Sequence, residues 1–209
     1  MDEGYPSLED FLNSREILKQ LRRSVAGGET SFAIEFDGIL EYNRDLAEQL
    51  LYNPKNFLSK ADEILQGITK MPSLHLRVCG KTGLWSLKPK DVRAEHVDRF
   101  IDVEGTVTQA GEMKFIRGAE EQPPFSAYRD YQRIRIDGVN VDLMDNMVGV
   151  ANAGNKIHAT GILAAVPSSQ DQFEKLLIAN CVVLPEKKEC EQKGGRWDGY
   201  MCVAEREMK

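Results

Sequence analysis

The residues best suited to chemistry in this chain stand at alternating positions of one segment. Residues 128–136 read Tyr-Arg-Asp-Tyr-Gln-Arg-Ile-Arg-Ile, a pattern typical of a β-strand. Because side chains alternate between the two faces of a strand, one face would carry Arg129, Tyr131, Arg133 and Arg135. Guanidinium groups beside an aromatic ring are suited to phosphate contact and base stacking. The spacing therefore predicts a nucleic-acid contact on this face.

The net charge of the whole chain argues against that prediction. Its 209 residues include 27 Lys and Arg against 33 Asp and Glu, which gives a formal net charge of −6. Nucleic-acid-binding proteins usually present a basic surface, so a basic surface here must be local. The alternative is that the arginines pair with carboxylates on neighbouring strands and stay in solvent.

The other candidate motifs do not predict catalysis. Gly80-Lys81-Thr82 resembles the end of a phosphate-binding loop, but His75 stands where that loop needs its first glycine. His75 and Cys79 are four residues apart, and a lone His/Cys pair is a weak metal signal. No Ser/His/Asp arrangement is suggested. We expect no enzyme activity, no cofactor and no bound metal, with Cys79 buried and His75 at the surface.

The chain contains four cysteines, Cys79, Cys181, Cys190 and Cys202. None belongs to a C-x-x-C pair, so a zinc site built from all four is not expected. Cys190 and Cys202 flank a Gly-Gly pair and Trp197, and two interpretations remain open. One is a small hairpin closed by a Cys190–Cys202 disulfide. The other is a pair of free thiols on a tail that binds a partner through Trp197 and Tyr200.

Helical patterns dominate the first ninety residues. Apolar residues at helical spacing predict a helix over 7–26, a short helix capped by Asn43 and a third helix that begins at Pro54. Alternating apolar residues predict two short strands, at 31–36 and 74–78. The segment 91–97 is expected to form a short polar helix.

Strand patterns follow from residue 100. They lie at 100–109, 113–117, 128–136, 139–143, 156–166 and 173–184. Gly105, inside the first of them, is expected to mark a bend or bulge. Asp137-Gly138 is a two-residue hairpin signal. This order predicts an α+β fold, with a helical subdomain followed by a small β-barrel.

Several segments, taken in order, resemble the N-terminal domain of archaeal minichromosome maintenance (MCM) helicases. They are the strand and helices at 32–54, the strand Phe-Ile-Asp-Val-Glu-Gly-Thr-Val within 92–107, the strand at 128–136, and the closing segments 142–145 and 153–162. The resemblance covers residues 7–186. It implies a helical subdomain over 1–90, a five-stranded OB-fold barrel over 91–186 and a cysteine-containing appendage over 187–209.

The chain also departs from that family. Residues 116–127 hold no cysteine or histidine, so the zinc module of the family has no ligands here. Asp137-Gly138 stands where the family has a long loop towards its ATPase domain. The hairpin tip at 167–174 lacks basic residues, and Lys175 is its first cation. The tail at 186–209 resembles no linker to an ATPase, which favours a stand-alone protein over a detached part of a longer helicase.

The resemblance implies a non-enzymatic binding module of DNA replication in an archaeal cytoplasm, associated with the nucleoid and not with a membrane. It would bind single-stranded or double-stranded DNA weakly, together with MCM helicase or other replisome proteins, and could form homo-oligomers. The residues expected at the DNA are Arg129, Tyr131, Arg133, Arg135 and Lys175. The alternative is an interaction module that has lost DNA binding and assembles with, or imitates, helicase subunits.

Overall fold

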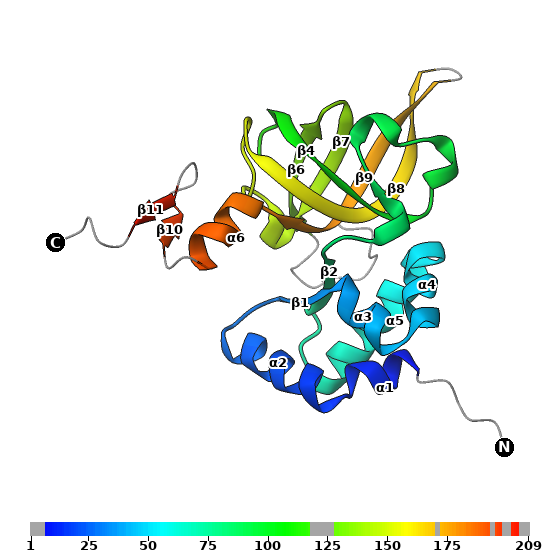
Figure 1. Ribbon diagram of the computed structural model, residues 1–209, viewed down its shortest axis with the longest axis vertical. Coiled ribbons are helices and arrows are strands. Elements are labelled where there is room, and N and C mark those ends of the chain that lie inside the picture. The colour runs from blue at the N-terminus through cyan, green and yellow to red at the C-terminus, as the bar shows by residue number, and fades with distance from the viewer. Residues whose placement is uncertain (1–6, 118–127, 170–171, 193–194, 198–201, 205–209) are drawn as a thin grey trace.

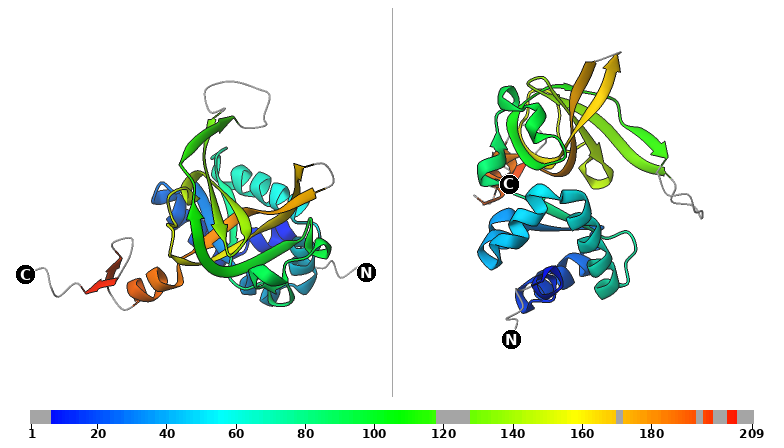
Figure 2. Two further views of the ribbon diagram at one scale, coloured as in Figure 1. Left: turned by 90° about the horizontal axis from the view of Figure 1, so that it is seen from above. Right: turned by 90° about the vertical axis from the view of Figure 1, so that its right-hand side faces the viewer.

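The computed structural model describes residues 7–117, 128–169, 172–192, 195–197 and 202–204. The chain forms a helical part and a sheet part that are stacked on each other (Figure 1). The helical part runs to residue 79, and the sheet part extends from residue 86 to residue 183. The right-hand view of Figure 2 shows the two parts one above the other, with the helices of residues 8–69 below the sheet part.

The helical part contains α1 (Leu8–Leu12), α2 (Arg15–Ala26), α3 (Phe36–Tyr42), α4 (Arg44–Tyr52) and α5 (Pro54–Thr69). The single helix predicted over 7–26 is wrong, because Ser14 has an extended backbone and begins α2 as a separate helix. The predicted cap is confirmed: the Asn43 side chain accepts hydrogen bonds from the backbone N–H groups of Asp45 and Leu46. Helix α3 had no sequence prediction.

Two short parallel strands complete the helical part. They are β1 (Ser31–Glu35) and β2 (His75–Cys79), and both were predicted to within one residue. Helices α3 to α5 lie between these strands in the sequence and pack with them around one apolar core. The core extends into the sheet part, because Phe100 is fully buried in it.

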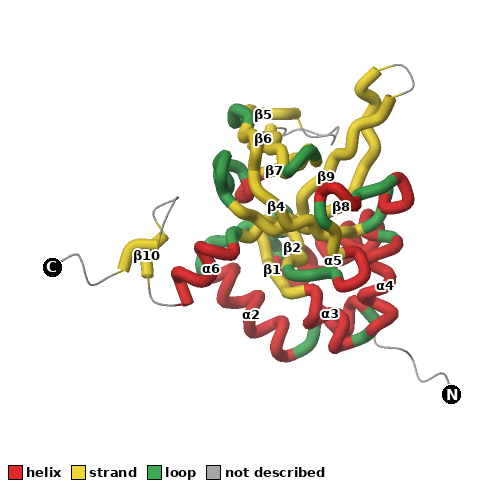
Figure 3. Tube along the Cα trace, turned by 45° about the horizontal axis from the view of Figure 1, so that its top comes forward, coloured by secondary structure: helices red, strands yellow, loops and turns green. Residues whose placement is uncertain are grey.

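The sheet part is a seven-stranded sheet in the order β3-β4-β8-β9-β7-β6-β5. The strands are β3 (Ser86–Leu87), β4 (Phe100–Ala110), β5 (Lys114–Arg117), β6 (Tyr128–Ile136), β7 (Val139–Met144), β8 (Lys156–Ser169) and β9 (Gln172–Val183). An additional pairing joins β4 to β6, so the sheet curls round a second apolar core (Figure 3). The predicted polar helix at 91–97 is replaced by 3₁₀ turns at Pro89–Asp91 and Ala94–His96.

Two sequence signals set the curvature of this sheet. Strand β4 pairs with β8 up to Thr106 and with β6 from Val107, and Gly105 lies at the change. A Cβ atom at Gly105 would lie 2.6 Å from Cγ2 of Ile136, so only glycine allows this close approach. Asp137 and Gly138 both have positive φ and join β6 to β7 by a two-residue turn, as predicted.

Side chains of the sheet part form hydrogen bonds with the edge of β2 that does not pair with β1. The Asn180 side chain on β9 accepts from the Val78 N–H at 2.6 Å and donates to the Leu76 carbonyl at 2.9 Å. The Thr160 hydroxyl on β8 donates to the Val78 carbonyl at 2.5 Å. A disulfide joins Cys79, the last residue of β2, to Cys181 on β9. The edge of β2 is therefore satisfied without a third strand.

The C-terminal segment consists of α6 (Pro185–Gln192), β10 (Gly195–Trp197) and β11 (Cys202–Ala204). Strands β10 and β11 form an antiparallel pair. Cys190 is buried and disulfide-bonded. The side chains of Trp197 and Cys202 and all of Tyr200 lie outside the described residues, so the Cys190–Cys202 pairing stays a prediction.

Candidate nucleic-acid interface

Strand β6 carries the predicted arginine face. Gln132, Ile134 and Ile136 are buried on its core side. The opposite side carries Arg129, Tyr131, Arg133 and Arg135, which are exposed or half-buried. The alternation that the sequence predicts is therefore present, and these four side chains share one face.

Arg129 is paired with a carboxylate. Its Nε lies 3.1 Å from both carboxylate oxygens of Asp145, which sits in the 3₁₀ turn after β7, and its Nη2 contacts the same group. Burial would raise the pKa of Asp145, but the hydrogen bond and charge of Arg129, together with the charge of Arg77, outweigh it and lower that pKa. Asp145 is therefore ionised at neutral pH and neutralises Arg129.

Arg133 is paired as well. Its Nε and Nη2 donate to the two carboxylate oxygens of Asp142 at 2.6 and 2.9 Å, a bidentate arrangement, and the Tyr131 hydroxyl donates to the same carboxylate at 2.8 Å. Burial and the hydrogen bond to Asp142 raise the pKa of Tyr131 to about 12. The hydrogen bond to Asp142 also raises the pKa of Arg133. The cross-strand pairing that was the alternative interpretation thus occurs at Arg133, and Arg129 pairs with a carboxylate in the turn that follows β7.

Arg135 and Lys114 also lie on this face, and neither has a carboxylate partner in the part of the chain that the structure describes. Lys114 lies opposite Tyr131 in the β5–β6 pair, so it faces the same side as the arginines. Among the described residues, no carboxylate forms an ion pair with Arg135 or with Lys114. The face therefore keeps an excess of positive charge, although the chain as a whole is acidic.

Lys175 is placed apart from the arginines. It lies on β9, which β7 separates from β6 in the sheet. Along β9, Lys175 alternates in step with Leu177, which is fully buried in the core of the sheet part. The arginines of β6 point to the opposite side of the sheet. Near the tip of the β8–β9 hairpin, Phe173 is 67% exposed.

Asp102 on β4, His158 on β8, Thr82 and Ser86 form a cluster, in which all but Ser86, at the start of β3, are buried. Asp102 Oδ1 accepts from the backbone N–H and the hydroxyl of Thr82, both at 2.6 Å. Its Oδ2 accepts from the Ser86 hydroxyl at 2.7 Å and lies 2.6 Å from His158 Nε2. The Ser86 hydroxyl therefore donates to the carboxylate and not to the histidine, so the Ser–His hydrogen bond of a catalytic triad is not formed here. The cluster anchors residues 82–86 to the sheet.

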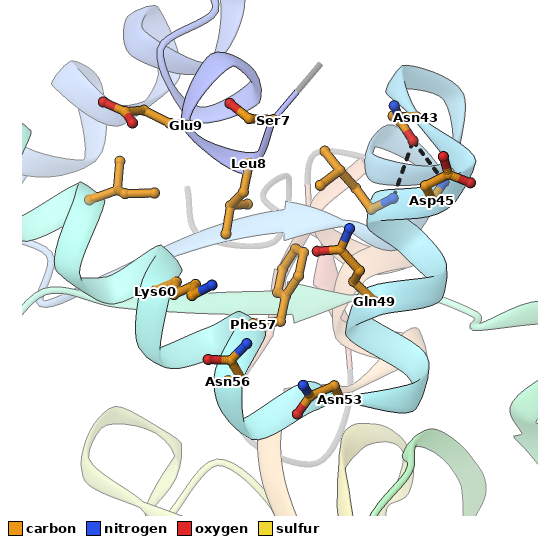
Figure 4. Close-up of a pocket in the computed structure, with 12 residues that line it drawn as sticks. Ser7, Leu8, Glu9, Asn43, Asp45, Gln49, Asn53, Asn56, Phe57 and Lys60 are labelled. Carbon is orange, nitrogen blue, oxygen red and sulfur yellow. Dashed lines mark hydrogen bonds between the residues drawn. The ribbon is translucent and has the colours of Figure 1, made fainter. Parts of the chain in front are cut away.

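An open pocket of about 570 Å³ lies between α1, α4 and α5 (Figure 4). Its polar lining includes Gln49, Asn53, Asn56 and Lys60, with the ring of Phe57 beside them. The amide oxygen of Asn43, at its rim, is already engaged as the cap of α4. Glu9 and Asp45 also line the pocket, and none of the ion pairs of the described residues joins two of its lining residues.

His75 and Cys79, the His/Cys pair that is a weak metal signal in the sequence, both bond to other residues. His75 Nδ1 lies 2.8 Å from Asp62 Oδ2, and Cys79 is in the disulfide with Cys181. Over the described residues, no group of three or more His, Cys, Asp or Glu side chains could hold a metal ion. None of the described helices is long and apolar enough to span a membrane.

Sequence reasoning missed residues whose roles depend on strand pairing. Lys114 joins the arginine face only because β5 pairs with β6 in that register. The sequence did not show that Asp142 and Asp145 would each pair with a particular arginine. The signal that could have found Asp142 is its position in a tight hairpin: a two-residue turn at 137–138 places it directly opposite Arg133.

Comparison with known proteins gives three findings. A family model of the MCM N-terminal domain matches residues 7–123. The DNA replication licensing factor mcm3 of Schizosaccharomyces pombe (strain 972) is 27% identical over 99 residues, which is 42% of this chain and 11% of that protein. The 1.8 Å crystal structure of the N-terminal domain of an archaeal MCM has a TM-score of 0.73 at 15% identity, with 84% of this chain and 96% of that chain covered. The chain thus spans a small part of the length of the curated relative.

Proposed function

Because the chain belongs to the family of MCM N-terminal domains, we propose that it is a non-enzymatic binding module that acts in DNA replication. The match of the family model over residues 7–123 is the observation that carries this proposal. We interpret β4, β6, β7, β8 and β9 as the five-stranded barrel of an OB-fold, a fold that commonly binds oligonucleotides. The corresponding division is a helical subdomain over 1–90, the OB-fold over 91–186 and an appendage over 187–209.

The proposed ligand is single-stranded or double-stranded DNA, bound weakly by the arginine face of β6. Arg135 and Lys114 support this, since their charges are not neutralised by an ion pair within the described part of the chain. Arg129 and Arg133 would contribute less, because each would have to share its guanidinium between a phosphate and its aspartate. Tyr131 offers a ring for stacking. Lys175 points to the other side of the sheet, so it would contact only a DNA strand that passes round the β8–β9 hairpin.

A salt titration of DNA binding tests this proposal. Binding of a labelled oligothymidine is followed by fluorescence anisotropy over a range of salt concentrations. Each lost phosphate contact on a single strand lowers the slope of log K against log salt by about 0.7. We expect that decrease for Arg135→Ala and for Lys114→Ala.

Arg44→Ala is the matched control, because Arg44 is an exposed helical residue that is ion-paired with Glu48 and far from β6 in the sequence. It removes the same charge from the chain and should leave the slope unchanged. Absence of binding at low salt would refute the DNA proposal. A slope that stays the same in the Arg135→Ala, Lys114→Ala double variant would refute the proposed face.

A second candidate function is protein interaction without DNA, in which the chain assembles with, or imitates, MCM helicase subunits. Exposed apolar side chains on the strands β5, β6 and β9 favour it: Phe115 is 78% exposed, Tyr128 70% and Phe173 67%. Such side chains are typical of interaction surfaces when they are grouped. Size-exclusion chromatography with light scattering, alone and with a full-length MCM helicase, tests this candidate. A chain that stays monomeric and never co-elutes with the helicase would argue against it.

A further inference from the structure

The contact between β2 and β9 combines one covalent bond with a few side-chain hydrogen bonds. Cys79 and Cys181 are separated by 102 residues in the sequence, and their Cα atoms are 5.4 Å apart. The hydrogen bonds beside them are the two of Asn180 and the one of Thr160 with the backbone of β2. These hydrogen bonds are buried, but they can break and re-form reversibly, whereas the disulfide opens only by a chemical reaction. The disulfide is therefore the part of the contact that cannot open by itself.

The helical part has other attachments to the sheet part, which do not depend on the disulfide. The ring of Phe100 is buried in the helical core. Arg99 donates to the carbonyl of Tyr52 and lies over its ring, and Lys55 pairs with Asp98 at 2.9 Å. These contacts involve α4, α5 and the beginning of β4. Loss of the β2–β9 contact would therefore leave the two parts joined through a second region.

We propose that the Cys79–Cys181 disulfide is a redox latch, which holds β2 on β9 when oxidised and lets this edge open when reduced. Both cysteines are buried, with exposures of 7% and 8%, so a dithiol can reach the bond only where this edge opens. Cys79 is the terminal residue of β2, and Gly80 follows it with φ +91°, so the chain leaves the strand directly after the bond. Opening at the end of a strand can stay local.

The chemical step is thiol–disulfide exchange with a dithiol. One thiolate of the dithiol attacks the Sγ of one cysteine, which breaks the protein disulfide and forms a mixed disulfide. That first attack releases the other cysteine as a thiolate. The second thiolate of the dithiol then attacks the dithiol's own sulfur in the mixed disulfide and releases the cysteine that was attacked first. The dithiol gives up two electrons and leaves as a cyclic disulfide, and both cysteine thiolates take up protons. Disulfides in reducing compartments are usually transient or redox-sensing, and this one joins two parts that are otherwise held together elsewhere.

Amide hydrogen exchange of the full chain can detect opening of this edge, because two neighbouring residues report differently. The Val78 N–H donates to Asn180 on β9, whereas the Leu76 N–H donates to Asp62 within the helical part at 2.7 Å. We expect reduction with millimolar dithiothreitol to accelerate exchange at Val78 by more than about tenfold, because exchange follows the population of the open state. Exchange at Leu76 should change little.

Cys181→Ser should reproduce the reduced behaviour without a reductant. Cys190→Ser is the matched control, since it removes a cysteine of the other disulfide and leaves the latch in place. Reoxidation of the reduced wild-type chain should restore slow exchange at Val78.

Three outcomes would overturn the latch. The first is equal exchange at Val78 in the oxidised, reduced and Cys181→Ser chains. The second is a disulfide that the dithiol does not reduce while the chain is folded. The third is acceleration at Leu76 and in buried strands such as β7 to the same extent as at Val78, which would make the bond a general stabiliser of the fold. The oxidised and reduced wild-type chains are enough to recognise each of these outcomes, so the test does not depend on whether Cys181→Ser folds.

Discussion

Replacement of Asp102 by alanine should destabilise this chain more than any change of a surface charge. Asp102 is 1% exposed and accepts hydrogen bonds from both donors of Thr82, from Ser86 and from His158. Alanine would leave these donors without an acceptor, and Thr82 and His158 are themselves buried. Removing one partner of a buried charged network costs about 3–5 kcal/mol in the free energy of unfolding. For a chain of this size, that corresponds to a decrease in Tm of roughly 6–20 °C.

Urea denaturation followed by circular dichroism measures this loss, and Glu104→Ala is the matched control. Glu104 stands two residues further along β4 and pairs with Lys156 at the surface, with side chains that are 40% and 55% exposed. An exposed pair of this kind contributes less than about 1 kcal/mol. If Asp102→Ala and Glu104→Ala lower the free energy of unfolding equally, then the buried cluster does not anchor residues 82–86 as we argue.

The effect of Asp102 should also depend on pH. Burial would raise the pKa of Asp102, but the hydrogen bonds from His158, Thr82 and Ser86 outweigh it and lower that pKa from its ordinary value of 3.8. A carboxyl whose pKa is lowered in the folded state stabilises the fold above its unfolded pKa, and this contribution is lost as the pH falls below it. The difference between wild type and Asp102→Ala should therefore be constant near neutral pH and decrease below about pH 4.

Two further predictions concern strand contacts and the hydroxyl of Tyr131. Gly161→Ala would place a Cβ atom 2.2 Å from the Ile178 carbonyl oxygen, so the free energy of unfolding in urea should fall by about 1–3 kcal/mol. Gly67→Ala, in the interior of α5 with open space around it, should instead raise the free energy of unfolding by up to about 1 kcal/mol; a loss at both positions would mean that the steric argument is wrong. In a spectrophotometric titration, the phenolate of Tyr131 should appear only at about pH 12, and Tyr131→Phe should remove that step. Because its pKa is raised, the Tyr131 hydroxyl stabilises the fold below about pH 10 and loses this effect as the pH rises to about 12. A titration step near pH 10 that disappears in Tyr131→Phe would contradict the hydrogen bond to Asp142.

Local patterns in the sequence were enough to predict the main strands of the sheet part and their turns. The alternation of 128–136 and the Asp137-Gly138 turn act through neighbouring residues, so their consequences are visible in the sequence itself. Gly105 could be recognised as a bend, but its close approach to Ile136 depends on strand pairing. The break between α1 and α2 was missed, because the apolar stripe continues across Ser14 although the backbone there is extended. Periodicity reports which face is buried and not whether the helix is continuous.

Contacts between distant segments could not be predicted. The Cys79–Cys181 bond is one of several pairings that four cysteines allow, and spacing alone does not choose among them. The same limit applies to Asp102, whose partners Thr82 and His158 come from opposite sides of it in the sequence. For the arginine face, the strand pattern predicted which side chains lie together, but the strand register decides which of them are neutralised by aspartates.

The dependence of β2 on β9 has a consequence for the order in which the chain folds during synthesis. The helical part is synthesised first. The hydrogen bond from the Val78 N–H can form only later, because its acceptor, Asn180, is 102 residues further along the chain. Until β9 has left the ribosome, β2 keeps an unpaired edge, and such an edge can pair with another chain and start aggregation. A protein shortened to its helical part would carry this exposed edge permanently. The helical part is therefore fully synthesised before the hydrogen bonds at the edge of β2 can form.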